Sequence, residues 1–287
     1  MGAMQQLPPP TAEAELLDFL LVALAPMNRT RVKQVLRSGR VHVNGTSVTR
    51  HDHPLRRGDT VSLSRDAPLS ADITGISIVH EDPYLVVIDK PAGLLTVATE
   101  SEKTDTAFVR LSAQLVARNA GRPFVVHRLD RDTSGLLLFA RSVEVRDQLQ
   151  ANWEAVAKTY LAVVEGTPNP AAGVVENFLT EGRDLRVRAG RHAGKDAKRA
   201  VSRYTTRATR DRYSLVEVEL ETGRKHQIRV HMAGLGCPVA GDKVYGAATD
   251  PARRLCLHAW RLAFDHPFTG DRVELESPLP EVLARVV

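Results

Sequence analysis

The 287-residue sequence contains only two cysteines, Cys237 and Cys256, which form no CxxC pair and cannot supply a disulfide framework. It also lacks the run of about 18 apolar residues that a membrane-spanning helix needs, and no basic start followed by an apolar run indicates a secretion signal. These absences predict a soluble protein of a reducing compartment, which we take to be the cytoplasm. Because 43% of its residues are hydrophobic, the chain can fill an ordinary globular core.

Acidic residues are fewer than basic ones, 34 against 39, and the resulting net charge of +5 is compatible with a polyanionic partner. The excess is concentrated in two segments. Residues 29–57 carry eight Lys and Arg against one Asp, a net charge of +7, and residues 183–203 carry eight against two, a net charge of +6. Gly190 and Gly194 predict a mobile loop or loose hairpin in the second segment. The alternative for both segments is a solvated basic face without a partner.

The first seventy residues predict a module of two helices and a hairpin. Leucines recur at helical spacing over residues 13–25, and a second helix is expected between Thr30 and Gly39. Alternating valines then lead into Asn44-Gly45, a strong hairpin signal. A stretch with small residues, Pro and no periodicity follows. We therefore place a small module at residues 12–65, a linker at 66–74 and a larger domain at 75–287.

The most informative stretch is residues 127–135, His-Arg-Leu-Asp-Arg-Asp-Thr-Ser-Gly, which lies between the apolar runs 124–126 and 136–140. A polar loop between two short apolar runs predicts strand, loop and strand, with the loop at the end of a sheet where sites are often built. The alternative is a solvated turn in which Asp130 and Asp132 pair with neighbouring arginines.

The string from His127 to Ala140 resembles the catalytic motif of the RluA-type family of RNA pseudouridine synthases. This resemblance implies that Asp130 is the catalytic residue. Further stretches resemble the other family motifs in the same order, and the likeness extends from about residue 12 to residue 270. It implies that Tyr160 faces the target base, that Arg229 pairs with the catalytic carboxylate, and that Lys90 supports the active-site loop.

Residues 29–45, which begin the first basic segment, are similar to an S-four-type RNA-binding domain, in which the basic helix and the following hairpin face the RNA. The second basic segment is interpreted as an RNA-contacting arm. Residues expected to contact RNA are Arg29, Arg31, Lys33, Arg37, Arg40, Lys90, Arg128 and Arg199. For Arg128 we expect a special role, because a planar guanidinium can stack and donate hydrogen bonds in the gap left by a flipped base.

The resemblance implies the conversion of uridine into pseudouridine, which breaks the C1′–N1 bond, rotates the uracil and joins C1′ to C5. No redox step or external group is required, so we expect no cofactor. A single carboxylate is chemically sufficient, either as a nucleophile toward the sugar or as a base at C2′, and the residues leave both roles open. We also expect no metal site, because His226 and His231 are five residues apart and cannot share one helical face.

These observations predict an α+β protein in which a small S-four-type RNA-binding module precedes a catalytic domain with a mainly antiparallel mixed sheet and flanking helices. The expected partner is RNA, with ribosomal RNA favoured and transfer RNA as the alternative, and we expect a monomer that does not bind membranes. Two other functions remain open. One is a non-catalytic RNA-binding or chaperone protein on the same fold, and the other is a base-excising glycosylase, which would release free uracil.

Overall fold

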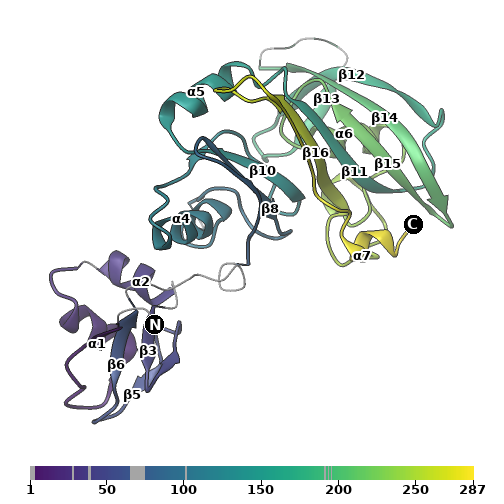
Figure 1. The fold of residues 1–287 in the computed structure, drawn as a ribbon. Coiled ribbons are helices and arrows are strands. Elements are labelled where there is room, and N and C mark those ends of the chain that lie inside the picture. Colours follow the sequence, from purple (N-terminus) through teal and green to yellow (C-terminus); the bar gives the residue numbers. More distant parts are fainter. Residues whose placement is uncertain are drawn as a thin grey trace. The chain divides into compact units, whose positions relative to one another are not determined.

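The computed structural model describes residues 4–27, 29–37, 40–64, 75–100, 102–190, 192, 194 and 196–287. By their contacts the residues divide into two units, Met1–Gly75 with Val109–Arg122 and Ile76–Phe108 with Pro123–Val287 (Figure 1). The linker expected at residues 66–74 lies outside the described residues. Within the described part, no helix combines the length and the hydrophobicity needed to cross a bilayer.

The first unit is a four-stranded sheet packed with two helices. The strand order is β1 (Met4–Gln6), β6 (Val61–Ser64), β3 (Val41–Val43) and β4 (Thr46–Ser47), while β2 (Ala14–Glu15) pairs with β5 (Pro54–Leu55). The helices are α1 (Leu16–Ala23) and α2 (Arg29–Arg37). Leucines of α1 and α2 pack against valines of the sheet in one core.

Two sequence expectations for this unit need adjustment. The helix expected over residues 13–25 begins only at Leu16, because Ala14 and Glu15 are taken up by the pairing with β5. The expected turn is present, with Asn44 and Gly45 at φ values of 51° and 79°, but the returning strand has only two residues. The longer partner of β3 is β6, which forms the middle of the sheet.

The second unit is built on an eleven-stranded sheet. Its main path runs β13 (Val187–Gly190), β12 (Ala172–Glu181), β14 (Lys198–Arg210), β15 (Tyr213–Leu220), β11 (Ala157–Glu165), β16 (Leu257–Asp265), β10 (Ser134–Ala140), β8 (Leu85–Lys90) and β7 (Ser77–Glu81). Strand β17 (Arg272–Glu276) pairs with β16, and β9 (Phe124–Val125) pairs with β10. Among these described pairings only β10 with β16 is parallel. The predicted α+β class with a mainly antiparallel sheet is confirmed.

Few helices accompany this sheet. They are α5 (Val143–Ala151), α6 (Gln227–Gly234), the short 3-10 helix η1 (Lys243–Tyr245) and α7 (Glu281–Ala284). A further helix, α4 (Ala107–Ala117), falls for the most part in the first unit, which includes Val109–Arg122. Ser142 caps α5 by accepting a hydrogen bond from the backbone N–H of Val145. Helix α6 packs into the core formed by β11, β15 and β16, which fixes the position of its first turn.

The second basic segment is more regular than its glycines suggested. Residues 187–190 form β13, which pairs with β12, and Lys198 begins the long strand β14. In these two stretches regular strand pairing replaces the expected mobile loop or loose hairpin. On β14, Arg199 forms an ion pair with Glu176 of β12, and Arg203 forms one with Glu221, which follows β15. Acidic residues across the ladder thus offset part of the positive charge of this segment.

Candidate active site

The loop of residues 127–133 enters the sheet where β10 runs parallel to β16. Ser134 lies opposite His258 and Gly135 opposite Ala259. Gly135 has a φ of 109°, and a Cβ at this position would lie 2.2 Å from the carbonyl oxygen of Ala259. Only glycine can make this close approach without moving a backbone. The end of the loop is therefore fixed by backbone packing.

Residues on both sides of Asp130 are held by side chains from another loop. The Thr96 hydroxyl donates to the carbonyl of Leu129 at 2.8 Å and accepts from its N–H at 3.0 Å. The Lys90 ammonium donates to the carbonyl oxygens of Pro91, Leu94 and Arg131. These bonds join the loop after β8 to the loop that carries Asp130.

Lys90 itself has no exposed surface, and burial lowers its pKa to about 7. Its three donors are used inside the protein, so direct RNA contact does not fit this side chain. The expectation that Lys90 binds RNA is corrected on this ground. Its support of the active-site loop, which the sequence also suggested, agrees with the three hydrogen bonds.

A buried chain of hydrogen bonds anchors Ser134. Nε2 of His258 lies 3.1 Å from the carbonyl of Ser277, which can only accept, so Nδ1 accepts from the Ser134 hydroxyl at 2.9 Å. The same hydroxyl accepts from Arg254 at 2.7 Å. Burial lowers the pKa of His258 and favours the neutral ring that this chain requires. The chain links the end of the motif loop to β16.

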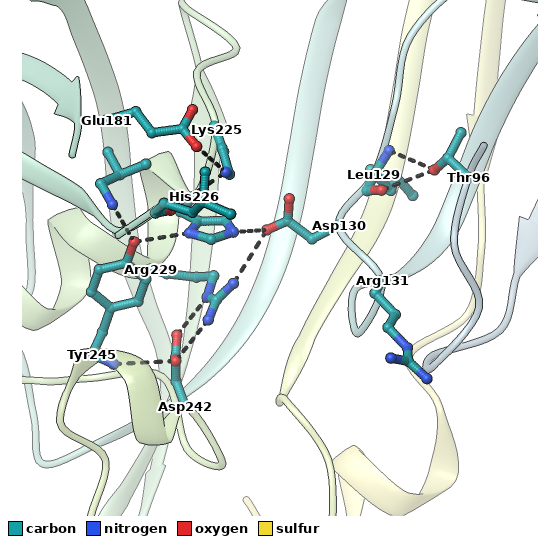
Figure 2. Close-up of polar contacts among 12 residues, drawn as sticks. Thr96, Leu129, Asp130, Arg131, Glu181, Lys225, His226, Arg229, Asp242 and Tyr245 are labelled. Atoms are coloured by element: carbon teal, nitrogen blue, oxygen red, sulfur yellow. Dashed lines mark hydrogen bonds and ion pairs between the residues drawn. The ribbon is translucent and has the colours of Figure 1, made fainter. Parts of the chain in front are cut away.

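Asp130 meets two basic side chains from the start of α6 (Figure 2). Its Oδ2 lies 3.5 Å from Nη1 of Arg229 and 3.8 Å from Nε2 of His226. The Asp130 side chain is 29% exposed, whereas that of Arg229 is 11% exposed. The carboxylate is therefore accessible from outside, and its basic neighbours are set deeper in the protein.

Arg229 is shared between two carboxylates. Its Nε and Nη2 donate to Asp242 at 2.6 and 2.8 Å, and Asp242 is almost fully buried. Burial acts to lower the pKa of Arg229, but the hydrogen bonds and charge of Asp242 together raise it. Because this bidentate pair fixes the plane of the guanidinium, the third nitrogen is directed toward Asp130. Asp242 thus orients Arg229 through the two nitrogens that do not face Asp130.

Tyr160 lies in β11 opposite Ala259 of β16, next to an irregularity in the register between Thr159 and Tyr160. Burial raises the pKa of its phenol above the ordinary value of 10.0, and the negative charge of Asp130 raises it further. The phenol is therefore neutral at neutral pH. It can donate a hydrogen bond but cannot serve as a base.

The residues expected to contact RNA differ in their surroundings. Arg128 is exposed, and its side chain has no hydrogen-bond or ion-pair partner among the described residues. Arg29 is exposed and Lys33 is partly exposed on α2. Arg40 donates from Nε to the carbonyl of Ser64 at 2.9 Å. The side chains of Arg31 and Arg37 lie outside the described part, and Arg199 holds its ion pair with Glu176.

His231, for which the sequence predicts no metal-binding role, faces the interior. Its two ring nitrogens lie 2.9 Å from the Ser202 hydroxyl and 3.1 Å from Oδ1 of Asn177. Burial lowers its pKa to about 4. Over the residues that the structure describes, no three His, Cys, Asp or Glu side chains form a group that could hold a metal ion.

Comparison with known proteins identifies the family and supports the fold. The profile of the RNA pseudouridylate synthase family matches residues 84–234. The chain belongs to this family. The matched range contains Asp130, Tyr160 and Arg229, so the synthase carries its three candidate catalytic residues inside the part that defines the family. The family predicted from the sequence is confirmed, whereas the S-four-type module stays a prediction.

Curated relatives cover nearly the whole synthase. An uncharacterized RNA pseudouridine synthase, YlyB, of Bacillus subtilis is 35% identical over 96% of this chain and 94% of its own. The ribosomal large subunit pseudouridine synthase D of Pseudomonas aeruginosa is 35% identical over 92% and 88%. Among solved structures, Human RNA Pseudouridylate Synthase Domain Containing 4 has a TM-score of 0.61 and 27% identity over 72% of this chain and 90% of its own.

Several supporting residues of the synthase had no role assigned from the sequence. Asp242 and Tyr245 were visible only as part of a motif, and Thr96 and Arg254 carried no signal at all. Their roles depend on contacts between distant parts of the chain, such as the hydrogen bond between Ser134 and His258. Periodicity and local spacing cannot reveal such contacts.

Proposed function

We propose that Asp130 is the catalytic carboxylate of this synthase and that it acts on the ribose of a uridine in ribosomal RNA. The observation that carries this proposal is the sharing of one guanidinium by two carboxylates. Because Arg229 is fixed by its two short bonds to Asp242, its third nitrogen faces Asp130 and orients that carboxylate. An oriented carboxylate can act as a nucleophile or as a base.

The reaction begins at the sugar. Asp130 either attacks C1′ or removes a proton from C2′, the C1′–N1 bond breaks, and its electron pair leaves with the uracil. After rotation C5 bonds to C1′; on the first route the Asp130–C1′ bond breaks in this step, and on the second route Asp130 returns the proton to C2′. The hydrogen on C5 is then lost as a proton, and N1 gains a proton. The charge of Asp130 contributes to the raised pKa of the Tyr160 phenol, so the two side chains lie near each other. The neutral phenol can therefore line the base pocket and donate a hydrogen bond to the uracil.

The choice of RNA rests on relatives and on charge. Relatives in Pseudomonas aeruginosa and Xanthomonas campestris are named ribosomal large subunit pseudouridine synthase D, at 35% and 33% identity. The basic helix α2 resembles the RNA-facing helix of an S-four-type domain. We therefore propose ribosomal RNA of the large subunit as the substrate, with phosphate contacts from Arg29, Arg31, Lys33, Arg37, Arg40 and Arg199. The reaction is proposed to occur in the cytoplasm.

Arg128 is proposed to fill the gap left by the extruded uridine. It is exposed, has no side-chain partner in the described residues, and lies two residues before Asp130. Arg128→Lys keeps the charge but removes the planar group that stacks. We expect lower turnover on a folded RNA and little change on an unstructured strand containing the same uridine. Equal turnover of both proteins on the folded RNA would rule out this role.

The substrate is tested by incubating the enzyme with unmodified transcripts of large-subunit ribosomal RNA, small-subunit ribosomal RNA and transfer RNA. Pseudouridines are then located as carbodiimide adducts that stop reverse transcriptase. The proposal predicts defined stops in the large-subunit transcript. Stops only in transfer RNA would overturn the ribosomal assignment and leave the isomerase in place. Free uracil would instead support a glycosylase, and binding without either product a non-catalytic RNA-binding protein.

A further inference from the structure

His226 occupies an unusual position beside Asp130. It immediately precedes α6 with a φ of 54°, a left-handed conformation that is uncommon outside glycine and in which asparagine, aspartate and histidine are enriched among the other residues. Its imidazole lies between two polar groups, with Nε2 3.8 Å from Oδ2 of Asp130 and Nδ1 2.8 Å from the hydroxyl of Tyr245 (Figure 2). The backbone conformation thus aims the ring along a line from Tyr245 to Asp130.

The hydrogen bonds around Tyr245 determine where the imidazole proton lies. The Tyr245 oxygen already accepts from the backbone N–H of Val187 at 3.1 Å. If it also accepted from Nδ1–H, its own hydroxyl proton would lose this partner. If it donates to Nδ1, both groups are satisfied, and the ring proton resides on Nε2. The Asp130 carboxylate near Nε2 also favours a proton on Nε2. The surroundings of both ring nitrogens therefore favour the same tautomer.

Asp130 offers its two oxygens unequally. The shortest approaches of Arg229 and His226, 3.5 and 3.8 Å, are both to Oδ2, and no hydrogen bond reaches Oδ1 from the described residues. Both distances are longer than an ordinary hydrogen bond, and such contacts often shorten when a substrate binds. Two N–H donors on one oxygen would hold the carboxylate from one side. The other oxygen would then be presented to the substrate in a fixed direction, which is what an attacking or proton-accepting oxygen requires.

We propose that Tyr245 fixes His226 as the tautomer with its proton on Nε2, and that this N–H acts with Arg229 to hold Oδ2 of Asp130 while Oδ1 faces the ribose. This assignment rests on the proposed catalytic role of Asp130. His226 is a positioning residue, because it acts through Asp130, and Tyr245 positions His226 in turn.

The surrounding charges support a neutral ring. Burial lowers the pKa of His226, the negative charges of Asp130 and Asp242 oppose this, and the positive charges of Arg229 and Lys225 add to it. The remaining group in contact is the Tyr245 phenol, whose pKa burial raises. A neutral imidazole can donate from only one nitrogen, so the choice of tautomer decides whether His226 presents an N–H or a lone pair to Asp130.

The tautomer is measured directly by nitrogen NMR of the full-length protein labelled with ¹⁵N-histidine. The signal of His226 is identified by its absence from His226→Asn. The proposal predicts a protonated Nε2 and an unprotonated Nδ1 at neutral pH, and a shift of this equilibrium in Tyr245→Phe. A protonated Nδ1, or a doubly protonated ring, would overturn it. This readout does not depend on activity.

Two substitutions separate positioning from a purely structural role. A glutamine amide nitrogen can reach the place of Nε2, whereas an asparagine amide nitrogen reaches only that of Nδ1. Asparagine, however, tolerates the left-handed backbone better than glutamine. A structural role predicts that His226→Asn is the milder change. The proposal predicts the opposite order, with kcat on RNA about ten- to a hundredfold lower for His226→Asn and distinctly less reduced for His226→Gln, at similar KM.

An equal loss in both variants, or a milder loss for His226→Asn, would overturn the positioning role. Asp130→Asn serves as the reference for the underlying function. If that variant remains active, the proposed role of Asp130 fails whatever the His226 variants do. If it is inactive while the order of the His226 variants is reversed, only the positioning role fails.

Discussion

Single residues around the site are mostly committed to partners inside the protein. Lys90 donates hydrogen bonds to three carbonyl oxygens, and two nitrogens of Arg229 donate to Asp242. Asp130 is different, because its side chain is 29% exposed and forms no hydrogen bond among the described residues. The proposed catalytic residue is thus the one whose carboxylate is accessible to a substrate.

Buried histidines should make the stability of the synthase sensitive to acid. Nε2 of His127 accepts from the N–H of Leu138, and burial lowers the pKa of His127 to about 3. Since this pKa lies below the unfolded value of 6.5, the stabilisation is complete above pH 6.5 and is lost as the pH falls toward 3. The slope is at most about 1.4 kcal/mol per pH unit for each such group.

The variant His127→Gln tests this slope, because its amide oxygen can accept the same N–H but does not titrate. As the pH falls from 6.5 to 4.5, we expect the free energy of unfolding to decrease more steeply for the wild type than for the variant. The difference in slope should approach about 1.4 kcal/mol per pH unit, the value for one additional proton bound on unfolding. Denaturant unfolding at several pH values measures both slopes. His231 contributes equally to both proteins and cancels. Parallel slopes would show that His127 is not held neutral.

Residue roles were predictable from sequence only where a motif carried them. Asp130 and Arg229 were paired by resemblance, and the structure brings their side chains to 3.5 Å. The link from His226 to Tyr245 joins residues 19 positions apart, and that from Thr96 to Leu129 joins residues 33 apart. Such contacts follow from the packing of loops against each other, and no local pattern encodes them.

At the level of elements, the parallel pairing of β10 with β16 positions the loop that carries Asp130. Strand β10 is buried on both faces, in agreement with its continuous apolar run. The sequence predicted a strand there, but it did not reveal that β16, more than a hundred residues away, lies beside it.

Gly135→Ala tests the importance of this pairing. The added methyl would lie 2.2 Å from the carbonyl oxygen of Ala259, and the φ of 109° is unfavourable for alanine. We expect a loss of about 3 kcal/mol or more in the free energy of unfolding, together with a loss of activity. Gly234→Ala is the matched control, since its Cβ would meet no atom within 4 Å. A Gly135→Ala protein as stable as this control would refute the argument.

On the scale of the whole molecule, basic residues occur in both units, but they differ in how far they are paired. In the second unit Arg203 and Arg261 form ion pairs with Glu221 and Glu276, and all four side chains are about half exposed. Exposed pairs of this kind contribute little to stability. In the first unit, α2 contains no acidic residue. Helix α2 is therefore the better candidate for phosphate contacts.

This difference can be measured through the salt dependence of RNA binding. The double variant Arg29→Gln, Lys33→Gln removes two charges from α2. Its slope of log binding constant against log salt concentration should be smaller by about 1.4 to 1.8 if both residues contact phosphates. The control, Arg203→Gln with Arg261→Gln, removes the same charge from paired positions and should change the slope little. Equal changes in both would mean that only the total charge matters.

The sequence predicts two structural units. The family match covers residues 84–234, which belong to the second unit except for residues 109–122. The sequence predicts a boundary near residue 75 because the composition changes there. The assignment of residues 109–122 to the first unit could not be predicted, because it depends on which distant residues they contact.

The most direct test of the account is tritium release from RNA labelled at C5 of uracil, with wild type and Asp130→Asn compared on the same ribosomal RNA. Tritium leaves C5 only when the new bond to C1′ forms and the proton is lost. We expect release by the wild type without free uracil, and no release by Asp130→Asn although it still binds the RNA. Release by both proteins would contradict the central claim that the Asp130 carboxylate performs the isomerisation.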